Sequence, residues 1–397
     1  MKKLKIAALL MIALFLMCTA ACSDDTAQDP AADSTNPTIG DPPVDVTPPN
    51  PADDQQDKDP IVDTPPADDK QNGTEEDDSA ANAPFLPEGN MNPLTGLYDG
   101  ISNEVLAHRP VAIMIGNSYS GLPQWGIGSA DIIYEMIAEG RITRLMAIYQ
   151  DYTKIDKVSS IRSARPYFID IAQSYGAVFV HFGASEPAVE QIALREDLIS
   201  IDGIKWPLEE IAFFRDPDRK KTLGGEHSVY TTGELLKLAF DRQSKTLTQS
   251  EHPSAFMFGD TSSAANGKPM SKVEVTFKNN HKPYFIYDTS TGEYLRYQYN
   301  EPHIDGLSGK QISVKNVLVL RMELTDLDHH LDIVDIQTTG SGSGYYFCKG
   351  KYIDITWEKD AYNSPIRYYT SDGSELILEP GQTFVSVVTD TASVVIE

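Results

Sequence analysis

The chain has 397 residues, of which 41% are hydrophobic, and a formal net charge of −25 at pH 7. This length and apolar content suffice for one or two domains with their own cores, and three cysteines are too few for a disulfide-built scaffold. The acidic balance is not accompanied by a basic patch or a nucleic-acid-binding motif, so we expect no nucleic acid among the partners.

The N-terminus has the parts of a secretory signal. Three lysines among the first five residues precede an apolar run from 6 to 17, which is shorter than the about 20 residues that cross a bilayer. Thr19-Ala20-Ala21-Cys22 then resembles the lipobox of bacterial lipoproteins. We therefore predict a signal peptide over residues 1–21 and a lipid on Cys22, which would anchor the protein to the extracytoplasmic face of the cell membrane. The alternative is an ordinary secretory signal that leaves Cys22 free.

Residues 22–90 differ sharply in composition from the rest. The stretch after Cys22 is rich in Asp, Pro, Ala and Thr and carries 18 acidic residues against two lysines, a net charge of −16. Such a segment buries too little apolar surface to offset its chain entropy, so we predict a disordered, lipid-anchored linker. Proline and charge repulsion should extend it beyond the about 45–50 Å expected of a flexible chain of this length. The chain's acidity thus belongs mainly to the linker.

Residues 91–258 alternate strand and helix patterns. Apolar runs and alternation predict buried strands at 110–115, 143–150 and 177–180, whereas 130–136 fits either a strand or a helix. Capping residues and prolines in the first turn predict helices at 166–173, 185–198 and 232–241. We therefore predict an N-terminal α/β layered domain.

Residues 259–397 contain mostly strand patterns separated by Gly, Asn, Asp and Pro. Lys349-Gly350-Lys351 predicts a tight hairpin turn. The run Gly340–Gly344 lacks the lysine and the following helix of a phosphate loop, so it predicts a flexible hairpin. The expected strands lie at 273–277, 283–287, 294–299, 312–324, 333–338, 344–349, 352–357 and 383–388. This half is predicted to be a mainly antiparallel β domain, and the whole chain a mixed α+β (α/β) protein.

The first half also holds the densest cluster of charged side chains. Residues at strand ends of an open α/β sheet face the crevice where ligands usually bind, and arginines hold carboxylates or phosphates with two hydrogen bonds. The alternative is a structural ion-pair network, because buried charges need partners. The candidate ligand-binding residues are Glu135, Glu139, Arg141, Arg144, Arg162, Arg165 and Glu226.

Two histidines are candidate catalytic residues, together with Glu139. His181 ends an apolar strand and His227 lies in a Gly-rich loop; either could act as an acid or base. For His181 the alternative is a buried histidine whose nitrogens are satisfied. Cys348 lies in an aromatic strand, where a buried, inert thiol is expected. The sequence has no serine-hydrolase elbow, zinc-protease motif or cysteine cluster, so we expect no metal and no cofactor.

Tyrosines recur through one part of the second half. Packing across strands explains most such stripes, whereas an exposed aromatic face would stack on a sugar or a peptide. The residues concerned are Tyr284, Tyr287, Tyr294, Tyr297 and Tyr299.

Several longer motifs resemble the YerB-like lipoproteins, the DUF3048 family. In the second half they are Asn316–Val319, Gly340–Gly344, Trp357 and Pro380–Thr383; in the first they are Arg109–Asn117, Ala130–Glu135, Glu139–Arg144, Arg162–Tyr167 and Glu226-His227. Gly116 and Ser228 stand where we expect Asp and Asn in the family. The resemblance implies a two-domain module on a bacterial lipoprotein and no particular reaction.

Two functions remain open from the sequence. The favoured one is a non-enzymatic surface module that binds an envelope glycan, a peptide or a protein at the crevice lined by Arg, Glu and His. The other is a cell-wall-acting hydrolase or transferase that uses His and Glu as acid and base. The absence of a recognisable nucleophile or metal motif in the sequence favours binding.

Overall fold

The structure is a computed structural model that describes residues 89–397, except 140–141, 246, 249–254, 278–280 and 329–332. The predictions for the signal peptide, for Cys22 and for nearly all of the linker over 22–90 therefore lie outside the described residues. So does candidate Arg141.

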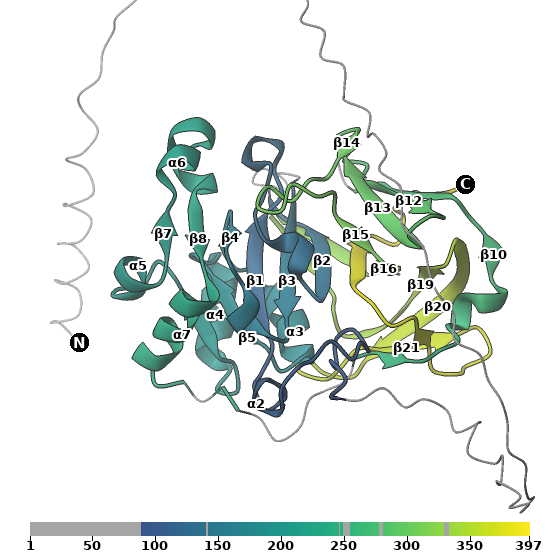
Figure 1. The fold of residues 1–397 in the computed structure, drawn as a ribbon, viewed down its shortest axis with the longest axis horizontal. Coiled ribbons are helices and arrows are strands. Elements are labelled where there is room, and N and C mark those ends of the chain that lie inside the picture. Colours follow the sequence, from purple (N-terminus) through teal and green to yellow (C-terminus); the bar gives the residue numbers. More distant parts are fainter. Residues whose placement is uncertain (1–88, 140–141, 246, 249–254, 278–280, 329–332) are drawn as a thin grey trace, which may run out of the picture. The chain divides into compact units, whose positions relative to one another are not determined.

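One large mixed sheet runs through the described residues (Figure 1), with β21 (Arg367–Thr370) beside one of its strands, β20. The strand order is β10 (Lys268–Pro269), β20 (Lys351–Lys359), β19 (Gly340–Cys348), β16 (Asn316–Arg321), β23 (Thr383–Val388), β2 (Ile132–Ile137), β3 (Thr143–Tyr149), β1 (Val111–Gly116), β5 (Val178–His181) and β6 (Ser200–Asp202).

Strands from both halves of the chain share this sheet. β2 pairs in parallel with β23, with Ile132 opposite Thr383 and Glu135 opposite Ser386. β1, β5 and β6 run in the same direction as β2, β23 and β16, whereas β3 runs against them. The carboxyl ends of these parallel strands therefore lie along one edge, the place where open α/β sheets usually bind ligands.

Two hydrophobic cores cover the two faces of the sheet, which explains why β1, β2 and β3 are buried along their whole lengths. On one face, Met114 packs in the core that contains α3 (Pro166–Ser174) and α4 (Glu186–Leu194). On the other, Ile113 packs in the core shared with α5 (Leu208–Ile211), α7 (Gly233–Arg242) and the second sheet. Burial on both faces is what a continuous apolar run in a parallel strand indicates.

The second sheet is antiparallel and contacts the main sheet through Phe285, whose ring lies 5.1 Å from that of Phe384. In Figure 1 it lies on the right, opposite the helices α5, α6 and α7. Its order is β14 (Glu301–Pro302), β13 (Glu293–Gln298), β12 (Tyr284–Asp288), β11 (Lys272–Val275) and β24 (Val394–Ile396), with β15 (Ser313–Val314) beside β13.

No helix in the described part is long and apolar enough to cross a membrane.

Shorter elements complete the described part. These elements are α2 (Asn103–Leu106), α6 (Pro217–Leu223), the 3-10 turns η2 (Tyr119–Gly121), η3 (Ile127–Ser129), η5 (Tyr152–Lys154), η6 (Gly225–His227) and η7 (Ser263–Asn266), and the small sheets β4 (Val158–Ser159) with β8 (Val229–Thr231) and β7 (Phe214–Arg215), β9 (Met257–Phe258) with β22 (Ile377–Leu378), and β17 (Leu324–Asp328) with β18 (Ile333–Ile336).

The predicted mixed α/β class is confirmed, and so is the hairpin turn after β19, where Lys349 and Gly350 have φ of 50° and 68°. The segment 130–136, which fitted a strand or a helix, contains the start of strand β2. Two expectations need correction: the expected strand 312–324 is divided among β15, β16 and the start of β17, and α4 ends at Leu194 rather than 198.

The run Gly340–Gly344 is not a flexible hairpin, because it forms the first half of β19 and pairs along β20. Its glycines allow close packing. A Cβ at Gly342 would lie 2.6 Å from the carbonyl oxygen of Arg321 and 2.6 Å from Nε1 of Trp357. The Trp357 indole donates to that same carbonyl at 3.0 Å, so the glycine makes room for a buried tryptophan.

Candidate functional site

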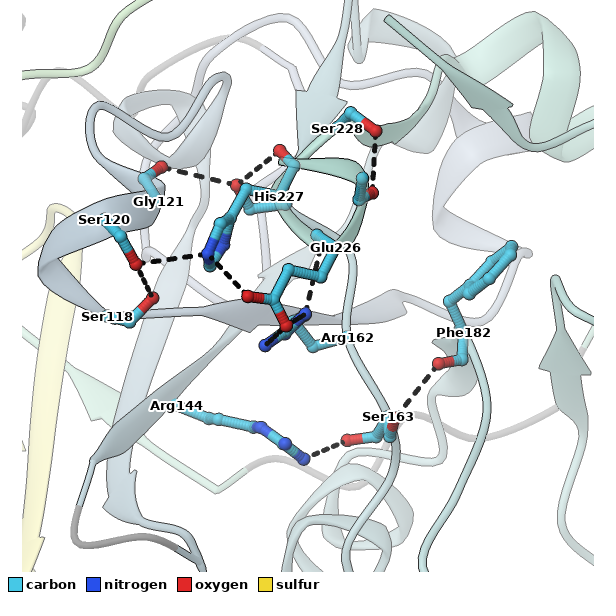
Figure 2. A network of polar contacts seen from close by, with 12 residues as sticks. Ser118, Ser120, Gly121, Arg144, Arg162, Ser163, Phe182, Glu226, His227 and Ser228 are labelled. Carbon is cyan, nitrogen blue, oxygen red and sulfur yellow. Dashed lines mark hydrogen bonds and ion pairs between the residues drawn. The ribbon is translucent and has the colours of Figure 1, made fainter. Parts of the chain in front are cut away.

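The candidate residues gather where β1, β2 and β5 end. The segment 160–165 lies across these strand ends: the Arg162 backbone N–H donates to the carbonyl of Met114 at 3.0 Å, and the Gly116 N–H donates to that of Ser160 at 2.8 Å. Figure 2 shows the network of polar contacts that this segment carries. Most of the described candidate residues thus lie near the carboxyl ends of these strands.

Glu139 joins two arginines in one ion-pair network. Its Oε1 lies 2.5 Å from Nη2 of Arg144, and its Oε2 accepts from Nε of Arg165 at 2.6 Å. Arg144 also donates to the carbonyl of Ser163 at 2.7 Å. Burial favours a raised pKa for Glu139, but Arg144 and Arg165 outweigh it and lower that pKa. The carboxylate is therefore ionised at neutral pH and held in place from two sides.

Arg162 forms a second, more accessible network with Glu226. Both of its terminal nitrogens lie 3.3 Å from Glu226 Oε2, and Nη1 donates to the Glu226 carbonyl at 3.0 Å. The Glu226 side chain is 64% exposed and that of Arg162 is 19% exposed. The mostly exposed Glu226 carboxylate is therefore a weakly bound partner of the partly buried Arg162 guanidinium.

His227 lies beneath that pair. Its Nε2 is 3.2 Å from Glu226 Oε1 and 3.2 Å from the hydroxyl of Ser120 (Figure 2). Burial, reinforced by Arg162, lowers the pKa of His227, so the ring is neutral at pH 7. Gly121 permits this approach, because a Cβ there would lie 2.7 Å from Nδ1 of His227.

Glu135 does not join this surface, although it was predicted to. It is fully buried and accepts from Arg296 at 2.8 Å, Asn117 at 2.9 Å and Thr143 at 2.7 Å, while His281 lies 3.3 Å away. Burial favours a raised pKa, but Arg296 and His281 outweigh it and hold the pKa of Glu135 at about 2. Glu135 therefore joins β2 to the second sheet inside the molecule.

His181 is also buried. Its Nδ1 lies 2.7 Å from the carbonyl of Gly183, and its Nε2 lies 2.7 Å from the hydroxyl of Ser200. This pattern fits a neutral ring that donates from Nδ1 and accepts at Nε2. Burial lowers its pKa in spite of the nearby Asp202. The structure thus favours the satisfied histidine over the catalytic one at this position.

A groove of about 810 Å³ opens beside the Arg162 network, and Ser120 belongs to both. Tyr119, Leu122 and Pro123 form one side of it, Leu223 at the end of α6 another, and the turn from β13 to β14 the third. The sequence pointed only to the tyrosine stripe here. It gave no signal for Tyr119, because that residue is remote from the stripe along the chain.

The tyrosines of the stripe do not share one surface. Tyr284 and Tyr297 stack on each other at 4.8 Å, and Tyr287 and Tyr294 form another pair at 5.1 Å, as cross-strand packing predicts. Tyr299 follows the strand and lines the groove instead. Cross-strand packing thus accounts for two pairs of the stripe, and stacking on a ligand stays a prediction for Tyr299.

Comparison with known proteins places the chain in a family. The family model described as "Protein of unknown function (DUF3048) N-terminal domain" matches residues 94–246, and the family model for the DUF3048 C-terminal domain matches residues 273–385. The chain belongs to the DUF3048 family. The expected YerB-like resemblance is thereby confirmed.

A protein of Bacillus subtilis (strain 168), "Putative lipoprotein YerB", is 29% identical to this DUF3048 chain over 309 residues, which cover 75% of the chain and 86% of the relative. The crystal structure of YerB from Bacillus subtilis superimposes with a TM-score of 0.65 at 28% identity, over 77% of this chain and 99% of that one. Among the residues described for this DUF3048 chain, no three His, Cys, Asp or Glu side chains are grouped to hold a metal ion.

Proposed function

We propose that this protein is a lipid-anchored surface protein that binds an anionic group of an envelope polymer at Arg162. The anchor is supported by the lipobox-like sequence before Cys22, and the similar Bacillus subtilis protein bears the name "Putative lipoprotein YerB". The observation that carries the binding proposal is the Arg162–Glu226 pair at the carboxyl edge of the sheet, in which the Glu226 side chain is mostly exposed.

The charges around this pair favour an anion. Arg144 and Arg165 share the carboxylate of Glu139, so among the described residues that network has one more positive charge than negative charge. Glu226 is mostly exposed, and an ion pair in that position contributes little stability, so it can be displaced. Arg162 would then offer its planar fork to a carboxylate or phosphate with two hydrogen bonds.

The alternative, a wall-acting hydrolase or transferase, has less support. Its acid or base would be His227, which is only 2% exposed. The lowered pKa keeps the ring neutral, so at pH 7 it is not the protonated form that an acid requires. Its carboxylate would be Glu139, which two arginines already bind. A general base needs access to a substrate proton, so this geometry suits binding better than turnover.

The proposal predicts opposite effects from the two members of the pair. Binding of the purified protein to isolated cell-wall sacculi can be measured by co-sedimentation at increasing salt. Arg162→Ala should weaken binding by about tenfold or more, because a charge-assisted contact is lost. Glu226→Gln should strengthen it, because a competing carboxylate is removed.

Arg367→Ala is the matched control, since Arg367 also forms an exposed ion pair, 3.2 Å from Glu375. That variant should bind like the unmodified protein. Equal losses in Arg162→Ala and Arg367→Ala would show a nonspecific charge effect, and weaker binding by Glu226→Gln would contradict displacement of its carboxylate.

A further inference from the structure

The groove beside the Arg162 network has fixed aromatic walls. The Tyr299 hydroxyl donates to the carbonyl of Asn117 at 3.0 Å, and its ring lies 4.8 Å from that of His281. Tyr119 meets the Tyr299 ring edge-on at 5.2 Å and is 70% exposed. The wall therefore presents an aromatic side chain to solvent next to one that hydrogen bonding holds in place.

Gln298 lines the same groove and is 2% exposed. Neither its amide nitrogen nor its amide oxygen has a hydrogen-bond partner within the described residues. A buried amide without partners is destabilising, so native proteins rarely keep one without a purpose. Its donor and acceptor lie side by side in one plane, which suits two neighbouring hydroxyl groups, one accepting and one donating.

The described side chains that line the groove include no cation for an anionic ligand. Most of its lining is apolar or aromatic, and the charged residue among the lining side chains is Glu301, which repels anions. His303 also lines it, but both of its nitrogens are engaged, with Arg296 and with Gln124. Burial lowers the pKa of His303 well below its ordinary value, so this ring is neutral.

The adjoining sheet edge is poorly suited to a peptide strand. β14 ends the order of the second sheet in the described part, has two residues, and the second of these is Pro302. A short edge strand with proline offers little backbone for strand addition. A ligand with an apolar face and hydroxyl edges fits these walls better.

We propose that this groove binds a neutral saccharide, whose ring stacks on Tyr119 and whose adjacent hydroxyl groups bond to the amide of Gln298. This inference concerns a different set of side chains from the anionic site at Arg162. The two sites meet at Ser120, so one polymer with neutral sugar rings and anionic groups could occupy both.

The test is titration calorimetry of the purified module with two neutral probes, cellotetraose and chitotetraose, which differ by the acetamido group. The unmodified protein should bind at least one of them. Tyr119→Ala and Gln298→Leu should each weaken that binding by about tenfold, through loss of stacking and of two hydrogen bonds. Tyr98→Ala is the control, because Tyr98 is exposed and does not line the groove.

Thermal unfolding separates loss of the site from loss of the fold. Gln298→Leu removes unpartnered polar atoms, so it should raise the melting temperature by about 2 °C while it weakens sugar binding. Both probes are uncharged, so their binding tests the groove independently of whether Arg162 binds an anion. The proposal is overturned if neither probe binds at millimolar concentration, or if Tyr119→Ala and Gln298→Leu leave binding intact. It is also overturned if neither sugar binds and only peptides bind in a way that Tyr119→Ala and Gln298→Leu weaken.

Discussion

Glu135 carries a negative charge in the core, and the residues around it keep it ionised. Although burial opposes the charge, Arg296 and His281 lower the pKa of Glu135 from 4.5 to about 2. Because the folded-state pKa lies below the unfolded one, the ionised group stabilises the folded protein above about pH 4.5. This stabilisation is lost as the pH falls towards 2.

Glu135→Gln should therefore be strongly destabilising at pH 7, by about 3–5 kcal/mol, because it leaves Arg296 buried without its carboxylate. The difference from the unmodified protein should shrink by on the order of 3 kcal/mol between pH 5 and pH 2. Urea unfolding at a series of pH values measures both. A difference that stays constant over this range would show that the Glu135 charge contributes no pH-dependent stability.

Glycines in β19 determine how closely that strand approaches its neighbours. A side chain at Gly342 would meet the Arg321 carbonyl and the Trp357 indole, both of which are already bonded to each other. Gly342→Val should destabilise the protein by about 1–3 kcal/mol through overpacking. Ser343→Ala, at the exposed neighbouring position of the same strand, should change stability by less than about 0.5 kcal/mol. Chemical denaturation compares the two. Because valine favours strands more than glycine does, an equally small effect in both variants would show that a side chain at position 342 is accommodated without overpacking.

The same strand illustrates what local patterns can predict. The apolar runs of β1 and β5 were predicted because burial on both faces of a parallel strand leaves a continuous signal. The glycine run was misinterpreted because the partners that require it, Arg321 and Trp357, are separated from it along the chain. A local pattern shows that glycine is needed but not which group fills the space.

The candidate site was also predicted only in part from the sequence. Arg162 lies near the strand ends, as the sequence suggested, and it meets Glu226 there across 64 residues of sequence. Glu135 was assigned to the same charged cluster, yet it is buried, and Arg296 approaches it from 161 residues away. Gln298 and Tyr119 escaped prediction because only the folded chain brings them into one groove.

The whole described molecule depends on one sheet that both family segments build. β2 is buried along its length and lies between β3 and β23, so its pairing is completed by a strand near the end of the chain. The first core likewise combines Tyr134 from the first half with Tyr346 and Trp357 from the second. Removing either half would expose a long apolar strand edge, which is prone to aggregate.

We therefore expect that neither residues 89–258 nor residues 259–397 fold cooperatively when expressed alone. Co-expression of the two fragments should restore a complex, because the β2–β23 pairing and the shared core need no covalent link. Size-exclusion chromatography and thermal unfolding followed by circular dichroism test this, with residues 89–397 as the control.

A fragment 89–258 that is monomeric and unfolds in a sharp transition near that of the control would show that β23 adds little to the stability of the first half. The two halves would then be independent domains that share a sheet edge, and substitutions at Ser386, opposite Glu135, should leave the first half unaffected.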